Sequence, residues 1–326
     1  MNYHRKPNED FDDYALRLYA NRTLYELDSH QIGDLLNQES GVRKDESAWR
    51  KFYAGVKYGI EYYKRKQCSD ISTRILSISD LHIPFQLPID ILEKYVDAVD
   101  ILQINGDVCD NQGTSKFQKC YRVSPMEEII QARQYLIDLI DYIRPKKVVV
   151  NYGNHDLRFQ NYLAKNLDTD ILELMPKTSL ELIIVDGFNH FNKRDRTKVW
   201  YSPLSEILED VEIEYVDSWY CQIGDAIFCH PSAFSSGILK TAEKAMLWFR
   251  NEEFFFRVLC MAHTHRIGQF TIGNTTIYEQ GAFCDVTRND YNDGRLYNSQ
   301  KEGFIYLCQD KDGNTLKDKT ELVVLN

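Results

Sequence analysis

The stretch Lys147–Asp156 reads KVVVNYGNHD and joins an apolar run to a polar one. Three consecutive valines are typical of a buried strand. A glycine, an amide, an imidazole and a carboxylate then follow in consecutive positions, and residues of these types rarely all belong to a hydrophobic core. The sequence therefore predicts a strand whose carboxyl end leads into a turn with a chemical role.

Two earlier apolar runs end in the same way. Residues 74–79 and 101–104 are expected to be strands, and helical patterns at 89–100 and 125–143 separate the three runs. This βαβαβ order predicts a parallel sheet with right-handed crossovers. The polar groups at the three strand ends are Asp80-Leu81-His82, Gly106-Asp107-Val108-Cys109-Asp110 and Gly153-Asn154-His155-Asp156. Because the carboxyl ends of neighbouring parallel strands face one crevice, we expect these groups to converge.

The second half of the chain adds histidines at two further strand ends. After about residue 210 the pattern becomes short strands and hairpins, two of which end in histidines. Of the eight histidines in the chain, five lie at strand ends in this series: His82, His155, His230, His263 and His265. One such histidine alone is usually a hydrogen-bonded loop residue. Five of them, together with carboxylates and a carboxamide, form the ligand chemistry that divalent cations prefer.

The composition describes a globular protein. The chain has 326 residues, of which 43% are apolar and 27% charged, with a net charge of −10. No apolar run reaches the roughly 18 residues of a membrane helix, and the first residues lack the apolar stretch of a secretion signal. We expect a cytoplasmic protein with no membrane partner. The net acidity argues mildly against a general affinity for nucleic acid, although a local basic patch overrides such an average.

The ordered set of motifs resembles the five-part signature of the calcineurin-like metallophosphoesterases. The motifs that carry the resemblance span roughly residues 74–280 and are Asp80-x-His82, Gly106-Asp107-x-x-Asp110, Gly153-Asn154-His155-Asp156, His230 and His263-x-His265. The resemblance implies an α/β fold, a two-sheet β-sandwich flanked by helices. It also implies two divalent metal ions. Manganese is the expected metal, and iron or zinc are alternatives because the same ligands accept all three.

The resemblance further implies a role for each motif residue. One metal would be held by Asp80, His82 and His265, and the other by Asn154, His230 and His263. Asp107 would bridge the two ions, and a bridging hydroxide would attack phosphorus. His155 corresponds to the catalytic histidine of the family, with Asp110 as its partner, and Asp156 would support the ligands from behind.

Two positions depart from the family pattern. Ala262 replaces the usual glycine before the His-x-His pair, which removes no ligand. Asn111 stands where phosphoprotein phosphatases of the family carry a phosphate-binding arginine, and this counts against that branch. Asn111 and Arg158 remain candidates for substrate contacts.

The chain divides into residues 1–70, a helical segment resembling a helix-turn-helix unit, and residues 71–326, the phosphoesterase domain. An insertion at about 157–203 is expected near the cleft. It places four basic residues among aromatic ones, and these cations are Lys193, Arg194, Arg196 and Lys198. Such interleaving suits a single-stranded nucleic acid, although a solvated loop with anchoring aromatics explains it equally well.

The amino-terminal segment is expected to contain two helices, at about 29–40 and 45–66. Trp49, Phe52, Val56, Ile60 and Tyr63 recur at helical spacing and are expected to share one buried face. The stretch 43–66 is basic, which is compatible with DNA binding. The alternative is a helical pair that covers the domain or mediates oligomerisation.

These observations favour a metal-dependent phosphodiesterase that acts on DNA, similar to the DNA exonuclease branch of the family and resembling phage-encoded members. Host cytoplasm would then be its location. One alternative is a small-molecule phosphatase or a cyclic-nucleotide phosphodiesterase. Another is a DNA-binding or assembly protein with a relic hydrolase core, against which the complete ligand set argues. The oligomeric state stays open.

Overall fold

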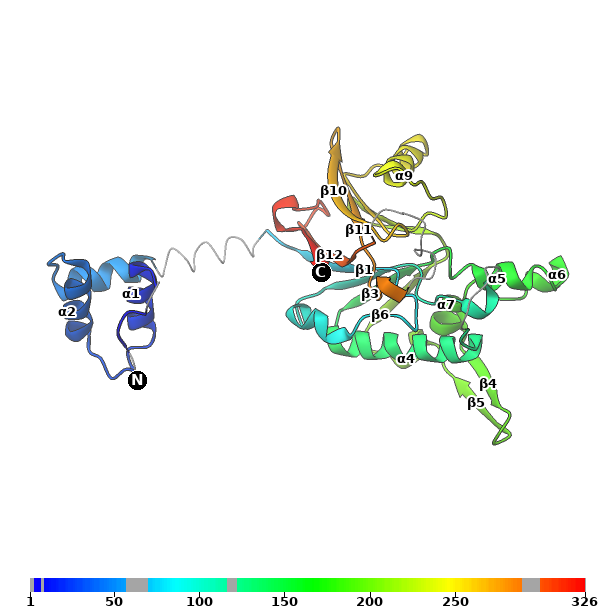
Figure 1. Ribbon diagram of the computed structural model, residues 1–326, viewed down its shortest axis with the longest axis horizontal. Coiled ribbons are helices and arrows are strands. Elements are labelled where there is room, and N and C mark those ends of the chain that lie inside the picture. The colour runs from blue at the N-terminus through cyan, green and yellow to red at the C-terminus, as the bar shows by residue number, and fades with distance from the viewer. Residues whose placement is uncertain (1–2, 7–8, 57–69, 116–121, 289–299, 326) are drawn as a thin grey trace. The chain divides into compact units, whose positions relative to one another are not determined.

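The computed structural model describes residues 3–6, 9–56, 70–115, 122–288 and 300–325 (Figure 1). The chain forms two compact units, Met1–Asp70 and Ile71–Asn326. Each unit has its own hydrophobic core.

The first unit is helical. It contains α1 (Phe11–Ala20), α2 (Ser29–Ser40) and a further helical segment at 46–56. Helix α2 begins with a capping box, in which Asp28 accepts from the Gln31 backbone N–H and the Gln31 side chain accepts from that of Asp28. It ends at Gly41 in the left-handed conformation, the usual stop signal for a helix.

The buried face of the segment 46–56 differs from the predicted one. Trp49 is buried, as expected, but the Phe52 side chain is 52% exposed and its neighbour Tyr53 is buried instead. Trp49 and Tyr53 are four residues apart and both join the core of this unit, whereas Phe52 points away and lies under the Lys44 ammonium, 5.6 Å from the ring centroid. The predicted continuation to residue 66, with Ile60 and Tyr63, lies outside the described residues.

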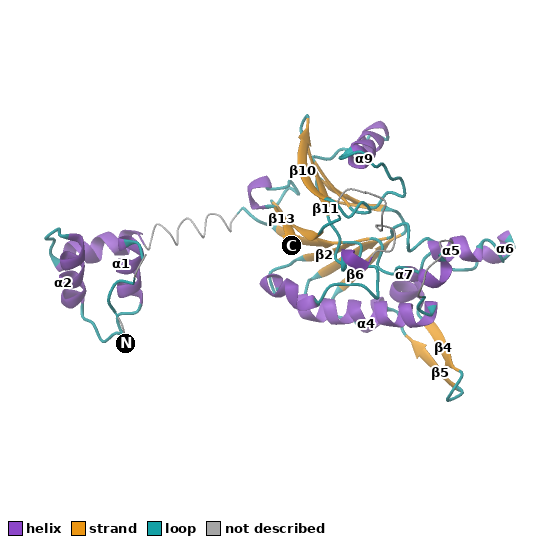
Figure 2. Cartoon of the chain, viewed as in Figure 1, coloured by secondary structure: helices purple, strands orange, loops and turns teal. Residues whose placement is uncertain are grey.

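Two stacked sheets form the second unit (Figure 2). The first sheet has the order β13-β12-β1-β2-β3-β6, with β1 to β3 and β6 parallel. Its strands are β1 (Thr73–Ile78), β2 (Ile101–Asn105), β3 (Lys147–Asn151), β6 (Glu212–Val216), β12 (Glu302–Gln309) and β13 (Glu321–Leu325). The predicted parallel core is present, and β6, expected among hairpins, extends it.

The second sheet has the order β10-β11-β9-β8-β7. Its strands are β7 (Tyr220–Ile223), β8 (Ala226–Cys229), β9 (Val258–Met261), β10 (Ile267–Ile272) and β11 (Thr275–Gln280). Strands β10 and β11 pair antiparallel as a hairpin, the pattern expected after residue 210, but β8 and β9 are parallel. They are joined through α9 (Lys240–Asn251), a helix that was not predicted.

Helices cover both outer faces of this pair of sheets. Apolar residues from the two sheets, such as Ile75 and Phe228, meet in one core between them. Helix α4 (Pro125–Ile143) packs on the outer face of the first sheet, and α9 packs on the outer face of the second. The expected α/β class, a two-sheet sandwich flanked by helices with a small helical amino-terminal segment, is confirmed.

The remaining elements are short. The segment 89–100, expected as an amphipathic helix, contains the 3-10 helix η1 (Ile89–Tyr95) instead. Residues 157–203 form several small elements: α5 (Arg158–Leu163), α6 (Thr169–Leu172), α7 (Ser179–Glu181), the π-helical turn η3 (Leu182–Asp186), β4 (Phe188–Asn192) and β5 (Thr197–Tyr201). The others are η2 (Gln112–Thr114), α8 (Leu204–Ile207), η4 (Val286–Arg288) and η6 (Lys317–Lys319). Among the described residues, no helix is both long and apolar enough to cross a membrane.

Candidate metal centre

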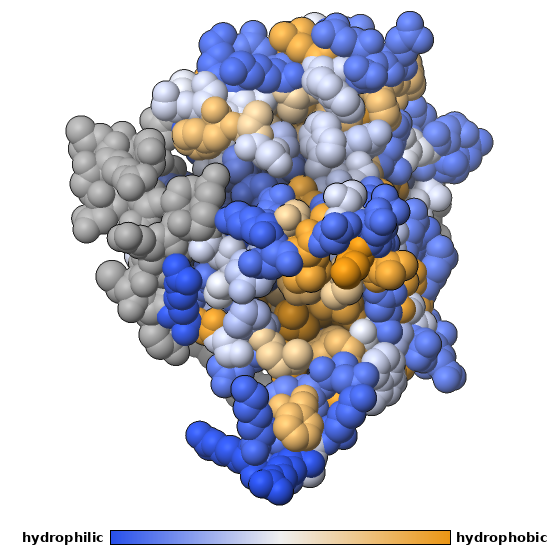
Figure 3. Space-filling model, turned by 90° about the vertical axis from the view of Figure 1, so that its right-hand side faces the viewer, coloured by the Kyte–Doolittle hydropathy of each residue, from blue (hydrophilic) through white to orange (hydrophobic). Residues whose placement is uncertain are grey.

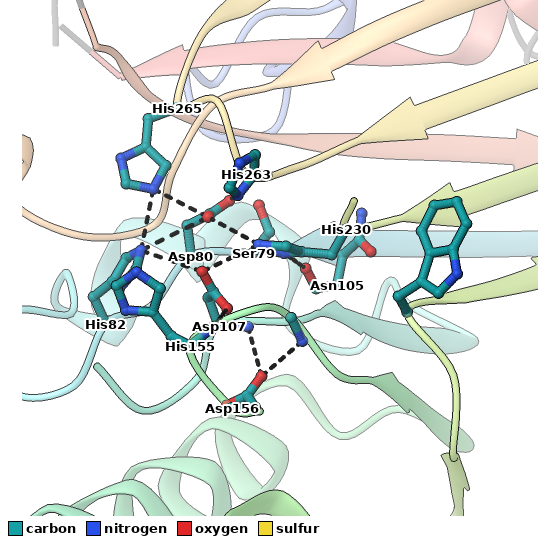
Figure 4. Close-up of polar contacts among 12 residues, drawn as sticks. Ser79, Asp80, His82, Asn105, Asp107, His155, Asp156, His230, His263 and His265 are labelled. Atoms are coloured by element: carbon teal, nitrogen blue, oxygen red, sulfur yellow. Dashed lines mark hydrogen bonds and ion pairs between the residues drawn. The ribbon is translucent and has the colours of Figure 1, made fainter. Parts of the chain in front are cut away.

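The polar strand ends converge on one site, as predicted (Figure 4). The turns after β1, β2 and β9 carry much of it, and they have an unusual backbone. Five side chains of the site stand on residues with positive φ angles: Asp80 (52°), His82 (44°), Asp107 (53°), His263 (81°) and His265 (52°). Residues other than glycine rarely adopt this conformation, and such strain gathers at functional sites.

One group of ligands comes from β1 and β9. Nε2 of His265 lies 3.0 Å from Oδ1 of Asp80 and 3.1 Å from Nε2 of His82. The ligand atoms of the three residues lie within 4.8 Å of one another, and all three side chains are buried. These are the residues expected to hold one metal ion.

A second group comes from β2, β8 and β9. Ligand atoms of Asp107, His230 and His263 also lie within 4.8 Å of one another. Nε2 of His263 and Oδ1 of Asn154 are buried, and each lacks a hydrogen-bond partner in the described part of the chain, whereas Nε2 of His230 faces the Asp107 carboxylate. Buried polar atoms without partners are rare, because each one costs free energy. Both atoms belong to residues expected to hold the other ion, and a cation would give each of them a partner.

Asp107 lies between the two groups. Its Oδ2 atom is 3.1 Å from Nε2 of His230 and 3.8 Å from Nε2 of His82. Its Oδ1 atom accepts from the backbone N–H of His155 at 2.7 Å, which fixes the carboxylate. This placement suits a carboxylate shared by two cations.

Hydrogen bonds from behind orient the imidazoles. Nδ1 of His230 lies 2.7 Å from the backbone carbonyl oxygen of Asn105, so Nδ1–H donates there and Nε2 is directed at Asp107. Nδ1 of His82 lies 3.2 Å from Oδ1 of Asp110 in the same manner. Second partners of this kind fix the tautomer and ring plane of metal-binding histidines.

The electrostatics of the site favour positive charge. Burial lowers the pKa of His82, but hydrogen bonds with Asp110 and Asp80 outweigh it and raise the pKa to about 10. Burial is likewise outweighed at His230, where the Asp107 and Asp80 charges raise the pKa to about 9. A histidine must lose the proton that charges its ring before it can bind a metal ion. Bound cations would then supply the positive charge that the protonated imidazoles otherwise carry.

Two glycines allow the ends of β2 and β3 to approach closely. A Cβ atom on Gly153 would lie 2.2 Å from Oδ1 of Asp107, and one on Gly106 would lie 2.7 Å from Nδ1 of His230. Asp156 ties the two turns together, because its Oδ2 atom accepts from the backbone N–H of Asp107 at 2.8 Å and from that of Gly153 at 2.9 Å. It supports the two turns from behind.

His155 lies beside the ligands and between two charged groups. Its Nδ1 atom is 2.8 Å from Oδ1 of Asp110, and its Nε2 atom is 2.7 Å from Nη2 of Arg158. Burial lowers the pKa of His155 to about 4, although the Asp107 charge and the Asp110 hydrogen bond oppose this shift. The neutral ring donates from Nδ1 to Asp110 and accepts at Nε2. A general-acid role requires a protonated ring, and that role stays a prediction.

Arg158 is therefore the hydrogen-bond donor next to His155. It begins α5, and its Nη1 atom also donates to the backbone oxygen of Asp110 at 2.8 Å. Its side chain is 16% exposed, so most of the guanidinium group and its stem is shielded from solvent. Asn111 is different, because it is only 2% exposed and its amide donates to the His155 backbone oxygen and to Ser179. Asn111 supports the turn, and this burial speaks against the substrate contact that was considered for it.

Sequence patterns did not identify two residues that shape the site. Glu128 of α4 is buried and accepts backbone hydrogen bonds from Asn111 and Gln112, which places the turn after Asp110. Asn105 orients His230 through its backbone carbonyl oxygen. Any residue type has this oxygen, so the sequence does not indicate the contact. A glutamate in the first turn of a helix is common for electrostatic reasons, so Glu128 gave no specific signal.

Unlike Arg158, the four clustered cations of the insertion lie on a separate two-stranded hairpin. Lys193, Arg194, Arg196 and Lys198 are exposed and lie on the β4–β5 hairpin. Within the described ranges, none of them has a hydrogen bond or ion pair with a residue of the metal centre.

Comparison with known families agrees with this site. Residues 73–266, more than half of the chain, match the calcineurin-like phosphoesterase family, and the protein belongs to that family. The resemblance predicted from the motifs is confirmed. Residues 1–68 match a different family, the YonJ N-terminal domain.

One similar protein is the SPbeta prophage-derived uncharacterized protein YonJ of Bacillus subtilis strain 168. The two are 32% identical over 62 residues, which are 19% of this chain and 15% of that protein. The similarity thus covers a small part of the relative. A prophage origin of this relative is consistent with the expected resemblance to phage-encoded proteins.

Several solved structures have a similar fold. Vacuolar protein sorting 29 from Cryptosporidium parvum is 15% identical with a TM-score of 0.36, and the match covers 79% of this chain and 100% of that one. An archaeal phosphodiesterase is 15% identical with a TM-score of 0.36, covering 77% and 99%. A metallophosphoesterase from Sphaerobacter thermophilus is 12% identical with a TM-score of 0.30, covering 78% and 88%. These are likenesses of fold.

Proposed function

We propose that the protein is a phosphodiesterase that uses two divalent cations to cleave DNA. Manganese is the first candidate for these cations. The observation that carries this proposal is the position of Asp107 between the two ligand groups, 3.1 Å from His230 and 3.8 Å from His82. When bound, two cations would polarise the phosphoryl group and acidify a water molecule. Asp80, His82 and His265 would hold one ion, and Asn154, His230 and His263 the other.

The residues around the ligands support a diester as the substrate. Arg158 brings one guanidinium to His155, and the position that carries a second phosphate-binding arginine in the phosphoprotein phosphatases holds the buried Asn111. A diester carries a single negative charge, whereas a terminal phosphate carries up to two. One arginine beside the cations therefore suits the diester better.

An aromatic ring supports a substrate with bases. Phe234 follows His230 in the chain, and its ring centroid lies 6.2 Å from that of His263. The ring is 50% exposed, and the Arg266 guanidinium lies 5.4 Å from its centroid. Arg266 itself is buried and donates to the backbone oxygens of Gly237, Ser235 and Ser236, which holds this loop in place. A half-exposed ring beside a phosphoester site offers a stacking surface for a nucleobase.

The residues around the site would act as follows. Arg158 would contact a phosphate oxygen next to the leaving group, where it stabilises developing negative charge. His155, held by Asp110, would position the Arg158 guanidinium and share its hydrogen bond. Phe234 would stack on the base next to the cleaved bond.

The test is a substrate panel on the full-length, manganese-loaded protein. The panel contains p-nitrophenyl phosphate, bis(p-nitrophenyl) phosphate, 3′,5′-cyclic AMP, and single- and double-stranded DNA, and Asp107→Asn serves as the inactive control. We expect hydrolysis of the chromogenic diester and of DNA, with loss of both on addition of a chelator. Preference for the monoester or for the cyclic nucleotide would overturn the DNA assignment. If the protein hydrolyses no ester with manganese, iron or zinc, the proposal that it is an enzyme would be wrong.

A further inference from the structure

We propose that the β4–β5 hairpin binds the unpaired bases and phosphates of a single-stranded nucleic acid that the metal centre cleaves. This inference rests on the proposed function and names the form of its substrate. The hairpin pairs Phe188 with Tyr201 at its base and Asn192 with Thr197 near its tip, and neither strand pairs with another sheet. Two strands of five residues are about 17 Å long.

One face of the hairpin combines aromatic and basic side chains. Because side chains alternate along a strand, Asn189 and Phe191 of β4 share a face with Lys198 and Trp200 of β5. Phe191 lies directly opposite Lys198 in the register, and Trp200 lies on the diagonal from Phe191. Phe191 is 55% exposed and Trp200 is 52% exposed. Two large rings with open faces, next to a cation, are what a run of unstacked bases requires.

The tip of the hairpin is positively charged within an acidic protein. The hairpin and its turn contain four basic side chains: Lys193, Arg194, Arg196 and Lys198. The one carboxylate among them, Asp195, accepts from the Asn192 amide at 2.9 Å. Among the described residues, none of the four cations has a carboxylate partner. Figure 3 shows the hairpin as the lowest projection of its face, with hydrophilic groups around an apolar patch.

The positive charge of the hairpin tip indicates which kind of partner binds this face. A second copy of the chain would bring its own four cations against these four, and like charges repel. A polyanion meets the cations with opposite charge, and its bases cover the two rings. Duplex DNA offers its phosphates but not the faces of its bases, so the exposed rings favour a single strand.

Contacts with α4 and with the core hold the base of the hairpin, so its aromatic and basic face has a fixed position in the second unit. The Arg133 side chain of α4 donates twice to the Ser202 backbone oxygen, at 3.1 and 2.9 Å, and lies 5.6 Å from the Tyr201 ring centroid. The Tyr201 ring stacks on that of Phe188 at 4.9 Å with an interplanar angle of 14°. Phe188 is 7% exposed and belongs to the core of the unit.

Helix α4 also connects the hairpin to the metal centre. Glu128 of this helix holds the turn after Asp110, and Arg133 lies five residues further along. Five residues correspond to about 7.5 Å along a helix axis. The base of the hairpin is therefore attached within two helical turns of the residue that supports the catalytic turn.

The test measures binding apart from cleavage, on the full-length protein. Binding of a fluorescein-labelled 15-nucleotide oligothymidylate is followed by anisotropy in the presence of a chelator, so that no cleavage occurs. Phe191→Ala/Trp200→Ala should weaken binding by at least about 25-fold, since each stacked base contributes roughly fivefold or more. Replacing Lys193, Arg194, Arg196 and Lys198 with Gln should lower the salt dependence, the slope of log K against log salt, by about three.

The matched control lies on the opposite face of the same hairpin. His190→Ala/Val199→Ala removes two side chains between the same strands, and we expect binding within twofold of the parent protein. Because Trp200 packs against Gly187, Phe191→Ala alone is a second variant that leaves the base of the hairpin intact. Oligouridylate and a duplex of the same length separate RNA and paired DNA from single-stranded DNA.

The outcomes distinguish this inference from the proposed function. Equal affinities of the two double variants would overturn the hairpin proposal, even if the protein cleaves DNA. A loss of dimers on light scattering in Phe191→Ala/Trp200→Ala, with unchanged DNA affinity, would show that the face binds a second copy and would also overturn it. Strong, hairpin-dependent binding by a protein that hydrolyses neither DNA nor bis(p-nitrophenyl) phosphate would instead refute the proposed function.

Discussion

Nη2 of Arg158 lies 2.7 Å from Nε2 of His155, so the histidine expected to act as an acid accepts a hydrogen bond from an arginine. The opposite ring nitrogen is engaged by Asp110 at 2.8 Å. Both nitrogens of His155 are therefore used within the protein, and the donor that remains available on this side of the site is the guanidinium. Arg158 is therefore the residue that we propose for the phosphate contact that position 111 does not provide.

Arg158→Ala should lower the turnover of a diester by about 10²- to 10³-fold, the usual effect of removing one donor to transition-state charge. Arg158→Lys should recover only part of this, because an ammonium cannot reproduce the fork of a guanidinium. The metal content should not change, since Arg158 is in neither ligand group. Steady-state rates with elemental analysis check both points. Lys165→Ala, which removes an exposed cation of the same segment, is the control, and a parental rate in Arg158→Ala would exclude the role.

Asp107→Asn should reduce the metal content from two ions per chain to one or fewer. A neutral carboxamide does not offset the repulsion between two dications, and Asp107 lies between both ligand groups. Elemental analysis after dialysis measures the ratio. The exposed Asp312→Asn gives the background, and retention of two ions in Asp107→Asn would contradict a shared carboxylate.

Manganese should stabilise the folded protein. Binding at 100 times Kd contributes about 2.7 kcal/mol per ion, which raises the thermal midpoint of a domain of this size by about 5–10 °C. The buried Nε2 atom of His263 lacks a hydrogen-bond partner among the described residues and would gain one ligand bond. Thermal scans with manganese and with a chelator measure the shift. His263→Ala should lose the part of the shift that this ion contributes, and an equal shift in the variant would place the ion elsewhere.

The metal centre was predictable because its information is local. Each ligand follows an apolar run, and turn residues such as Gly153 stand directly beside the ligands they serve. The parallel order of the strands then brings these turns together, so a few short patterns suffice for the convergence of the site, whereas the two-sheet fold was expected from the family resemblance.

Other elements depend on contacts between distant residues. The β4–β5 hairpin was treated as an insertion, because its pairing shows only once Phe188 and Tyr201 are seen to stack. Helix α9 did have a signal, the apolar residues Ala242, Ala245, Met246 and Phe249 at helical spacing, which all turn out to be buried. Glu128 had none, because its role arises from burial under a turn that lies 17 residues away in the sequence.

Glu128 leads to a prediction about pH. Burial raises the pKa of this carboxyl to about 8 from a usual value of 4.5, against the backbone hydrogen bonds from Asn111 and Gln112. A folded-state pKa above the unfolded one means that folding takes up a proton between these values. Stability is therefore fully present below about pH 4.5 and is lost as pH rises towards 8, by up to about 1.4 kcal/mol per pH unit. Glu128→Gln cannot ionise and should show a weaker fall.

The measurement is the thermal midpoint at pH 5.5 and pH 8 for the parent protein and Glu128→Gln. Other titrating groups contribute equally to both proteins, so the difference between the two pH slopes isolates Glu128. The control is Glu127→Gln, which changes the exposed neighbour on the same helical turn and should keep the parental slope. Identical slopes in all three proteins would mean that Glu128 is ionised throughout, because the two backbone N–H groups would then outweigh its burial.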